Sequence, residues 1–440
     1  MTTIHAELSA FGGIIQLCTV DKMAMRVLMF GWELPPHNSG GLGTACQGLL
    51  ESLTAEGVEV TFVMPRAIDA DSTGARLIFT NSEGVSVRYI DSLLTPYLSS
   101  KEYERSRRSQ NGKTGLYGHS ILDEVRRYAI AARKIAREEK FDIIHAHDWL
   151  SFGAGLAAKE VSGKPLIVHV HATQFDHNGG NAGDPALHAI EHDGIERADK
   201  VIAVSDYTKQ LLIRHYKVDP TKIEVVHNGV KTEGGNRKNN SFNLKALKAG
   251  KAKIVLFLGR ITLMKGPDYF IKAAEVVLRY EPNTYFLIAG AGDMERRMIE
   301  LAASKGIGDK VLFVGFVRGD KRRALYEAAD LYVLPSVSEP FGITPLEAMD
   351  AGTPVLISRQ SGVSEAVQHA LKVDFWDTDE MASKILSVLQ HDSLAKTLSQ
   401  NGAQEVLSVN WNKAAKKVQQ VYRKIISFFK KDNDDAGDSS

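Results

Sequence analysis

The feature that most constrains this chain is an alternation of short apolar runs with longer segments of helical period, from about residue 25 to residue 408. The runs are rich in β-branched residues and form two sets. The first set is Val27–Phe30, Val60–Met64, Ile143–Ala146, Leu166–His171, Val201–Val204 and Glu224–Val226, and the second is Ile254–Leu258, Phe286–Ala289, Val311–Phe316, Leu331–Leu334 and Pro354–Ile357. Near-continuous apolar strands separated by amphipathic helices are typical of parallel sheets covered on both faces. The alternation therefore predicts an α/β protein with two doubly wound domains.

The domain boundaries follow from the same pattern. Residues 231–250 separate the two sets, are rich in Gly, Asn and Lys, and show no apolar period, so we expect a linker there. This places a first domain at residues 25–230 and a second at residues 251–408. Strand-like runs at Arg76–Thr80 and Val85–Ile90 are expected to extend the first domain.

The two ends of the chain differ in character. Residues 409–428 carry apolar side chains at helical spacing, which predicts a helix that either closes the second domain or crosses back to the first. Residues 1–24 lack the basic region of a signal peptide and are expected to form a disordered leader. The polar residues 429–440 are expected to form a disordered tail.

Composition excludes several classes of partner. The formal net charge of the 440-residue chain is only +1, so nothing in its electrostatics favours nucleic acid. No apolar run reaches the roughly 20 residues that a membrane-spanning helix requires. Two cysteines, Cys18 and Cys46, are too few for a disulfide framework, and we expect a cytoplasmic protein.

Doubly wound domains bind ligands in the crevice outside the carboxyl ends of their strands, so the loops after the strands are the places to look for chemistry. In the second half, Glu339 and Glu347 flank a glycine-containing turn that opens a helix. The amides of such a turn can bind phosphate or sugar hydroxyls. Thr344-Pro345-Leu346-Glu347 also fits a capping box with Pro at the first helical position, and the residues alone leave both interpretations open.

A second loop of this half carries two cations. Arg260 and Lys265 follow the strand Ile254–Leu258 and precede a helix that begins near Gly266. Two cations beside a helix N-terminus could stabilise a diphosphate leaving group, whose charge grows as the bond to it breaks. A solvated basic loop is the alternative.

The first half offers candidates in three loops. Gly40 and Gly41 precede a helix expected at Thr44–Leu53, so their backbone could approach phosphates. Asp148 and Trp149 end a buried strand and could bind and stack on a sugar, although a purely structural role fits them equally well. His171 ends the next strand, where a functional role is favoured over a structural one.

The segment EPFGITPLEAMDAGTPV resembles the glutamate-x7-glutamate motif of the family-four retaining glycosyltransferases. That family has the GT-B fold, in which two Rossmann-like domains face each other across a central cleft. The resemblance implies that Glu347 meets the donor ribose and that Glu339 lies by the transferred sugar. It further implies diphosphate binding by Arg260 and Lys265, and backbone contacts to the donor from Phe341, Gly342, Ile343 and Thr344.

Other segments support the resemblance. The loop containing Gly290 resembles the family's glycine turn near the nucleotide, and the segment containing Val317 resembles the one that contacts the base. The glycine pair Gly40-Gly41 resembles a loop of glycogen and starch synthases, although Asn38 stands where those enzymes carry lysine. His145-Ala146-His147-Asp148-Trp149 and His171 also match glycogen-synthase-like members.

The resemblance therefore implies a retaining transferase that moves a hexose, with glucose favoured, from a nucleoside-diphosphate sugar to a glycan, with an α-glucan as the favoured acceptor. A cell-surface or exopolysaccharide glycosyltransferase and a sugar-nucleotide epimerase are the alternatives. A nicotinamide-dependent enzyme is disfavoured because Cys46 stands where a dinucleotide fingerprint requires glycine. We expect no cofactor and no metal, since Asp69-x-Asp71 and Asp377-x-Asp379 lack supporting ligands. The base of the donor and the oligomeric state stay open.

Overall fold

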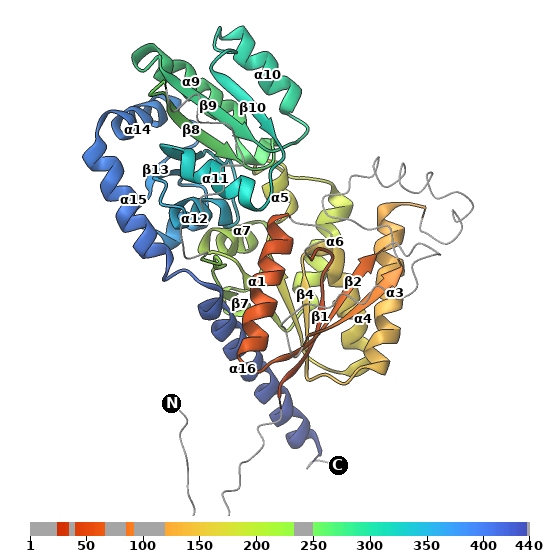
Figure 1. Ribbon diagram of the computed structural model, residues 1–440. Helices are drawn as coiled ribbons and strands as arrows, with labels where there is room; N and C mark the ends of the chain where they lie inside the picture. Colours follow the sequence, from red (N-terminus) through yellow and green to blue (C-terminus); the bar gives the residue numbers. More distant parts are fainter. Residues whose placement is uncertain (1–23, 35–39, 67–84, 92–118, 233–249, 438–440) are drawn as a thin grey trace, which may run out of the picture.

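The computed structural model describes residues 24–34, 40–66, 85–91, 119–232 and 250–437. The expected strand at Arg76–Thr80, almost all of the expected leader and linker, and Asn38 lie outside these residues. Two parallel sheets form the framework, one in each half of the chain (Figure 1).

The first sheet has the strand order β3-β2-β1-β4-β5-β6-β7, and all of its neighbours pair in parallel. Its central strands are buried, and most of their side chains are apolar. The strands are β1 (Arg26–Phe30), β2 (Glu59–Arg66), β3 (Val85–Asp91), β4 (Ile143–His147), β5 (Leu166–Val170), β6 (Lys200–Ala203) and β7 (Ile223–Val225). The helices that connect them are α1 (Gly41–Ala55), α3 (Ile121–Glu138), α4 (Trp149–Ser162), α5 (Gln174–His177), α6 (Pro185–Arg197) and α7 (Asp206–Tyr216), with a short 3-10 helix, η1 (Pro220–Lys222).

The second sheet has the order β10-β9-β8-β11-β12-β13 and is also parallel. Its strands are β8 (Lys253–Leu258), β9 (Thr284–Ala289), β10 (Val311–Gly315), β11 (Leu331–Leu334), β12 (Val355–Ser358) and β13 (Leu371–Val373). Its helices are η2 (Leu263–Lys265), α9 (Pro267–Tyr280), α10 (Glu295–Ser304), α11 (Asp320–Ala328), α12 (Ile343–Asp350), α13 (Val363–Ala366), α14 (Thr378–Gln390) and α15 (Asp392–Val406). The strand β13 was not among the predicted strands, since it is only three residues long and includes a lysine.

In both sheets the strand order reverses beside the first strand of the domain. The switch points lie between β1 and β4 in the first sheet and between β8 and β11 in the second. Ligands of doubly wound sheets bind at such points, outside the carboxyl ends of the strands. The loops after β1, β4, β8 and β11 are therefore the places where a site is expected.

The last helix, α16 (Trp411–Gly437), belongs to the first domain (Figure 1). Trp411, Val418 and Tyr422 are buried in the hydrophobic core of that domain, and α16 packs against α1. A side chain at Gly48 of α1 would overlap the Trp411 ring, which explains the glycine there. The helix also continues to Gly437, past residue 429, where the sequence predicts that a disordered tail begins.

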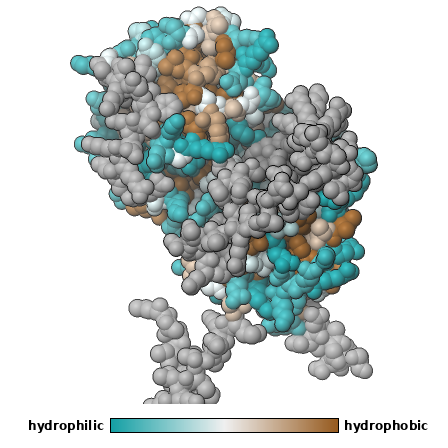
Figure 2. All heavy atoms as spheres, turned by 45° about the vertical axis from the view of Figure 1, so that its right-hand side comes forward, coloured by the Kyte–Doolittle hydropathy of each residue, from teal (hydrophilic) through white to brown (hydrophobic). Residues whose placement is uncertain are grey.

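Large apolar side chains are exposed on elements of both domains, and the face drawn in Figure 2 shows apolar residues on the upper, second domain among hydrophilic ones. None of the described helices combines the length and apolar character that crossing a bilayer requires.

Candidate active site

The loop after β8 presents Arg260 and Lys265 beside the start of α9. Lys265 ends η2, and Gly266 follows in the left-handed conformation with φ of 63°. A Cβ on Gly266 would lie 2.2 Å from the carbonyl oxygen of Pro335, which follows β11. This close approach is possible only for glycine. It brings the Lys265 loop directly against the loop that leads to Glu339.

Lys265 and Glu339 form an ion pair in the structure, and Ser336 Oγ donates to the same carboxylate oxygen at 3.1 Å. The Lys265 side chain is 15% exposed and that of Glu339 is 7% exposed, so little solvent screens the pair. The sequence predicts both residues as site residues, but their direct contact comes from the joining of the loops after β8 and β11.

The structure of the turn from Phe341 to Glu347 contradicts the capping box, one of the two interpretations that the sequence allowed. The helix α12 begins at Ile343, its N-cap is Gly342, and no side chain caps it, so the capping box proposed for Thr344 and Glu347 is wrong. Gly342 has φ of 100°, which shifts the helix start before Thr344. Thr344 Oγ1 accepts a hydrogen bond from Tyr332 at 2.8 Å.

Glu347 instead points toward α11. Its carboxylate lies 3.0 Å from the guanidinium of Arg322 and accepts a hydrogen bond from Tyr326 at 3.0 Å. Phe341 is buried, 3% exposed, and its ring stacks on His227 with centroids 5.8 Å apart. The side chain of Phe341 is therefore enclosed within the protein, and its carbonyl accepts a hydrogen bond from the amide of Val363 at 2.6 Å.

The glycine turn after β9 supports the Arg260 loop from the other side. Gly290 has φ of 148°, and a Cβ there would lie 1.9 Å from the carbonyl oxygen of Gly259. The amide of Ile261 donates to Ala291 O at 3.0 Å. Val317, after β10, is partly buried against the second-domain core. Gly290 thus has a clear structural role in holding Arg260.

In the first domain, Gly40 caps α1 and Gly41 is its first residue, so this helix starts earlier than the sequence predicts. The amide of Gly40 donates to the carboxylate of Glu33. Glu33 is fully buried, and burial raises its pKa, while the nearby charge of Arg260 lowers it. One amide at this helix start is therefore already bound to a carboxylate.

Asp148 has a strained backbone, with φ of 57°. Its Oδ1 accepts hydrogen bonds from the amides of His171 at 2.7 Å and Ala172 at 3.4 Å, which links the ends of β4 and β5. Burial raises the pKa of Asp148 to about 8, opposed by these two amides and assisted by Asp176 and Glu33. Non-glycine residues in this conformation are concentrated at functional sites. Trp149 begins α4 and packs against the first-domain core.

His171 belongs to a stack of four imidazoles on one face of the first sheet. Its Nε2 lies 2.9 Å from Nδ1 of His147, while His145 and His169 complete the stack. Burial lowers the pKa of each of the four, and that of His147 to about 3, so the rings are neutral near pH 7.

Three of these histidines have ligand-capable nitrogens within 4.8 Å of one another: His145, His147 and His169. This group is not evident from the sequence because its members come from two strands, β4 and β5. The rings of His145 and His169 are nearly parallel, with planes 15° apart. Parallel rings direct their lone pairs side by side, whereas a tetrahedral metal needs ligands that converge. The expectation that no metal binds stays a prediction.

The two domains meet at this site through residues that sequence reasoning did not single out. His177 of α5 faces the second domain, and its pKa falls to about 4 because of burial and then the charges of Arg260 and Lys265. Ser338 Oγ donates to Asp176 Oδ1 at 2.6 Å across the cleft. The sequence signal for Asp176 and His177 is their position after β5, and that for Ser338 is its place directly before Glu339.

Comparison with known proteins decides the family. Residues 39–233 match the model of Glycosyltransferase Family 4, and residues 239–405 match that of Glycosyl transferases group 1. An uncharacterized glycosyltransferase from Methanocaldococcus jannaschii is 30% identical over 91% of this chain and 98% of its own length. The chain belongs to glycosyltransferase family 4.

This glycosyltransferase has relatives with different acceptors in their names. It is 31% identical to a D-inositol 3-phosphate glycosyltransferase of Salinispora arenicola over 66% of this chain and 70% of that protein. It is 28% identical to a glycogen synthase of Mycobacterium tuberculosis over 90% of this chain and 94% of that protein.

The GT-B fold of this glycosyltransferase is shared with solved structures. That of Anabaena HepE in complex with UDP and glucose has a TM-score of 0.68, with 18% identity, and the similarity covers 91% of this chain and 100% of the other. The predicted fold class is thereby confirmed.

Proposed function

We propose that this glycosyltransferase is a retaining hexosyltransferase that moves a hexose, with glucose favoured, from a nucleoside-diphosphate sugar to a glycan acceptor. The observation that carries the proposal is the meeting of loops from both domains, joined by the hydrogen bond from Ser338 to Asp176. In the second domain Lys265, after β8, pairs with Glu339, after β11, and Arg260 lies on the same loop as Lys265. In the first domain Asp148, after β4, binds the amide of His171, after β5.

The leaving group is assigned to the second domain. As the bond to the anomeric carbon breaks, negative charge accumulates on the diphosphate, and fixed cations stabilise it more in the transition state than in the ground state. Arg260 and Lys265 would supply this charge together with the amides at the start of α12. Glu347 would hold the ribose in place of its present partner Arg322.

The transferred sugar is assigned to the space between Glu339, Asp148 and His171. Neutral imidazole and a carboxyl group both hydrogen-bond hydroxyls. Because the Glu339 carboxylate is engaged by Lys265 and Ser336, we propose that it orients the sugar and does not attack it. The acceptor would then attack on the face from which the diphosphate departs, and the departing phosphate oxygen would take its proton.

An α-glucan is the favoured acceptor on the strength of the glycogen synthase relative. The test incubates the protein with ADP-, UDP- and GDP-glucose, each with maltooligosaccharides and, separately, with inositol phosphate. Proton NMR of the product gives both acceptor and anomeric configuration. An α-glucoside of a maltooligosaccharide supports the full proposal, whereas a β-linked product contradicts retention and transfer to inositol phosphate contradicts the glucan acceptor.

A further inference from the structure

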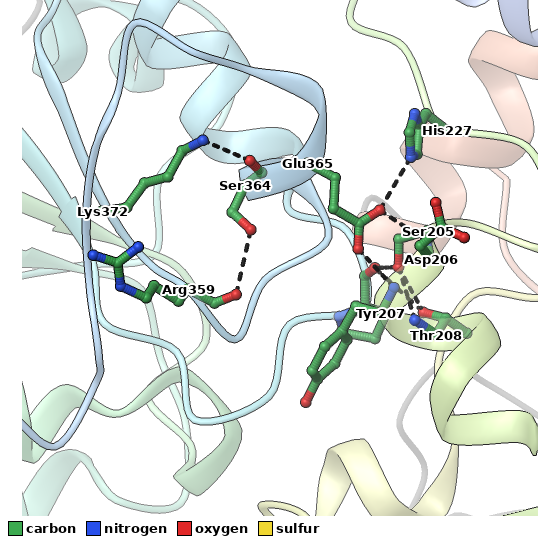
Figure 3. A network of polar contacts seen from close by, with 10 residues as sticks. Ser205, Asp206, Tyr207, Thr208, His227, Arg359, Ser364, Glu365 and Lys372 are labelled. Atoms are coloured by element: carbon green, nitrogen blue, oxygen red, sulfur yellow. Dashed lines mark hydrogen bonds and ion pairs between the residues drawn. The ribbon is translucent and has the colours of Figure 1, made fainter. Parts of the chain in front are cut away.

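A carboxylate of the second domain binds the start of a first-domain helix. Glu365, on α13, accepts hydrogen bonds from the amide of Tyr207 at 2.6 Å and that of Asp206 at 2.8 Å (Figure 3). His227 Nε2 lies 3.3 Å from the same carboxylate. Helix N-termini favour negative charge because their first amides have no partner within the helix. The contact therefore joins the two domains through hydrogen bonds from helix-start amides to a carboxylate.

The same turn of α7 also touches the loop that carries Glu339. Ser205 Oγ, the cap of α7, donates to Pro340 O at 2.6 Å. Tyr207 Oη lies 2.9 Å from Ser338 Oγ. Ser338 and Pro340 directly precede and follow Glu339, so α7 of the first domain contacts both neighbours of a proposed site residue in the second.

The turn before Glu365 packs closely against both the loop that carries Glu339 and the start of α7. A Cβ on Gly362 would lie 2.2 Å from Pro340 O and 2.5 Å from Ser205 Cβ. The amide of Gly362 donates to Glu339 O at 2.9 Å. The turn that carries Glu365 is thus bonded to the backbone of Glu339 on one side and to α7 on the other.

We propose that Glu365 is a positioning residue for transfer: by holding the start of α7 against the second domain, it keeps Ser205 and Tyr207 on the residues that flank Glu339. This rests on the proposed role of Glu339 at the transferred sugar. Glu365 acts on that sugar only through the loop 338–342. Its loss should lower kcat more than it raises the KM of the donor, because the phosphate-binding loop with Arg260 stays in place.

Glu405 offers a matched control. Its carboxylate also accepts from two consecutive amides, those of Gln368 at 2.7 Å and His369 at 2.8 Å, and lies 3.1 Å from His369 Nδ1. All of these partners belong to the second domain. Glu405→Ala therefore removes the same kind of interaction without touching the contact between domains.

The experiment compares Glu365→Ala, Tyr207→Phe and Glu405→Ala in the full chain. Hydrogen–deuterium exchange should become faster at residues 338–342 in the first two variants and stay unchanged there in Glu405→Ala. Turnover should fall by about 10- to 100-fold in Glu365→Ala, the scale expected when catalytic groups shift by about 1 Å. Tyr207→Phe keeps its ring and its amide, so it reports the contact with Ser338 even if Glu365→Ala folds poorly.

The outcomes separate this inference from the proposed function. If hydrogen–deuterium exchange at residues 338–342 is unchanged in both Glu365→Ala and Tyr207→Phe, the positioning role is overturned, whatever reaction the protein catalyses. Faster exchange with unchanged kcat also overturns it. Faster exchange in a protein that transfers no sugar from any tested donor supports the contact and contradicts the proposed function instead.

Discussion

Lys265 is a cation that is held by a second loop of its own domain. It already has an anionic partner in Glu339, so a donor diphosphate would meet a cation that is held in place and largely shielded from solvent. Preorganised charge of this kind needs no rearrangement when the bond breaks. The sequence predicts Lys265 from its position after β8, but it cannot predict the pairing, because that depends on two loops 74 residues apart.

Replacement of Lys265 by alanine should lower turnover by at least ~100-fold, the scale expected for loss of one preorganised charge. Lys272→Ala is the matched control, since Lys272 pairs with Asp268 at 2.9 Å on α9 and is 41% exposed. Steady-state kinetics with the accepted donor measure both. Near-normal turnover of Lys265→Ala would exclude the lysine from leaving-group stabilisation.

Asp148 should make stability depend on pH. Its folded-state pKa of about 8 lies above the ordinary value of 3.8, so between these pH values the folded protein binds more protons than the unfolded one. The contribution of Asp148 to stability should therefore be complete below about pH 4 and be lost as the pH rises toward 8. Melting temperatures from pH 4 to 9 should fall less steeply for Asp148→Asn than for the wild type. Parallel curves would show that Asp148 titrates normally. Burial also raises the pKa of Glu191 to about 8, so part of the decrease in melting temperature with rising pH should remain in Asp148→Asn.

At the scale of elements, the strands were largely predictable and their ends were not. Buried parallel strands need continuous apolar runs, so β8 and β11 stand out in the sequence. For the start of α12 the sequence leaves two interpretations open, because Thr344 and Pro345 also satisfy a capping pattern, whereas in the structure Gly342 is the N-cap. Local patterns compete at helix ends, and tertiary contacts decide between them.

The turn between η2 and α9 gives a prediction at this scale. Gly266→Ala should destabilise the protein by more than the ~1 kcal/mol that left-handed backbone costs an alanine, because its Cβ would overlap Pro335 O. Gly306→Ala is the control, since Gly306 has φ of 71° and open space around its Cβ position. Urea unfolding of both compares them directly. Equal losses would mean that the loops after β8 and β11 separate easily.

At the scale of the whole molecule, the chain passes twice between its domains. It enters the second domain after residue 232 and returns with α16, whose Trp411, Val418 and Tyr422 lie in the first-domain core. Helical spacing predicts the helix but not the domain it joins, because an apolar stripe fits either core. The contacts of Glu365 and Asp176 across the cleft were unpredictable for the same reason: periodicity identifies elements, not the side chains that two domains bring together.

The packing of α16 in the first domain can be tested by asking which elements become less protected from amide exchange when a residue of α16 is replaced. Tyr422 is fully buried, and its hydroxyl lies 2.5 Å from Nδ1 of His145 on β4. Tyr422→Ala removes a large aromatic ring from the first-domain core, a change that costs about 3–5 kcal/mol for comparable aromatic deletions. Amide exchange should therefore become faster in β1, β4 and α1, while β8 and β9 keep their protection. Faster exchange confined to the second domain would contradict the assignment of α16 to the first. His145 stacks on His147, and His147 contacts His171. The Tyr422→Ala variant should therefore also lower turnover, because it disturbs the imidazole stack while Arg260 and Lys265 stay in place.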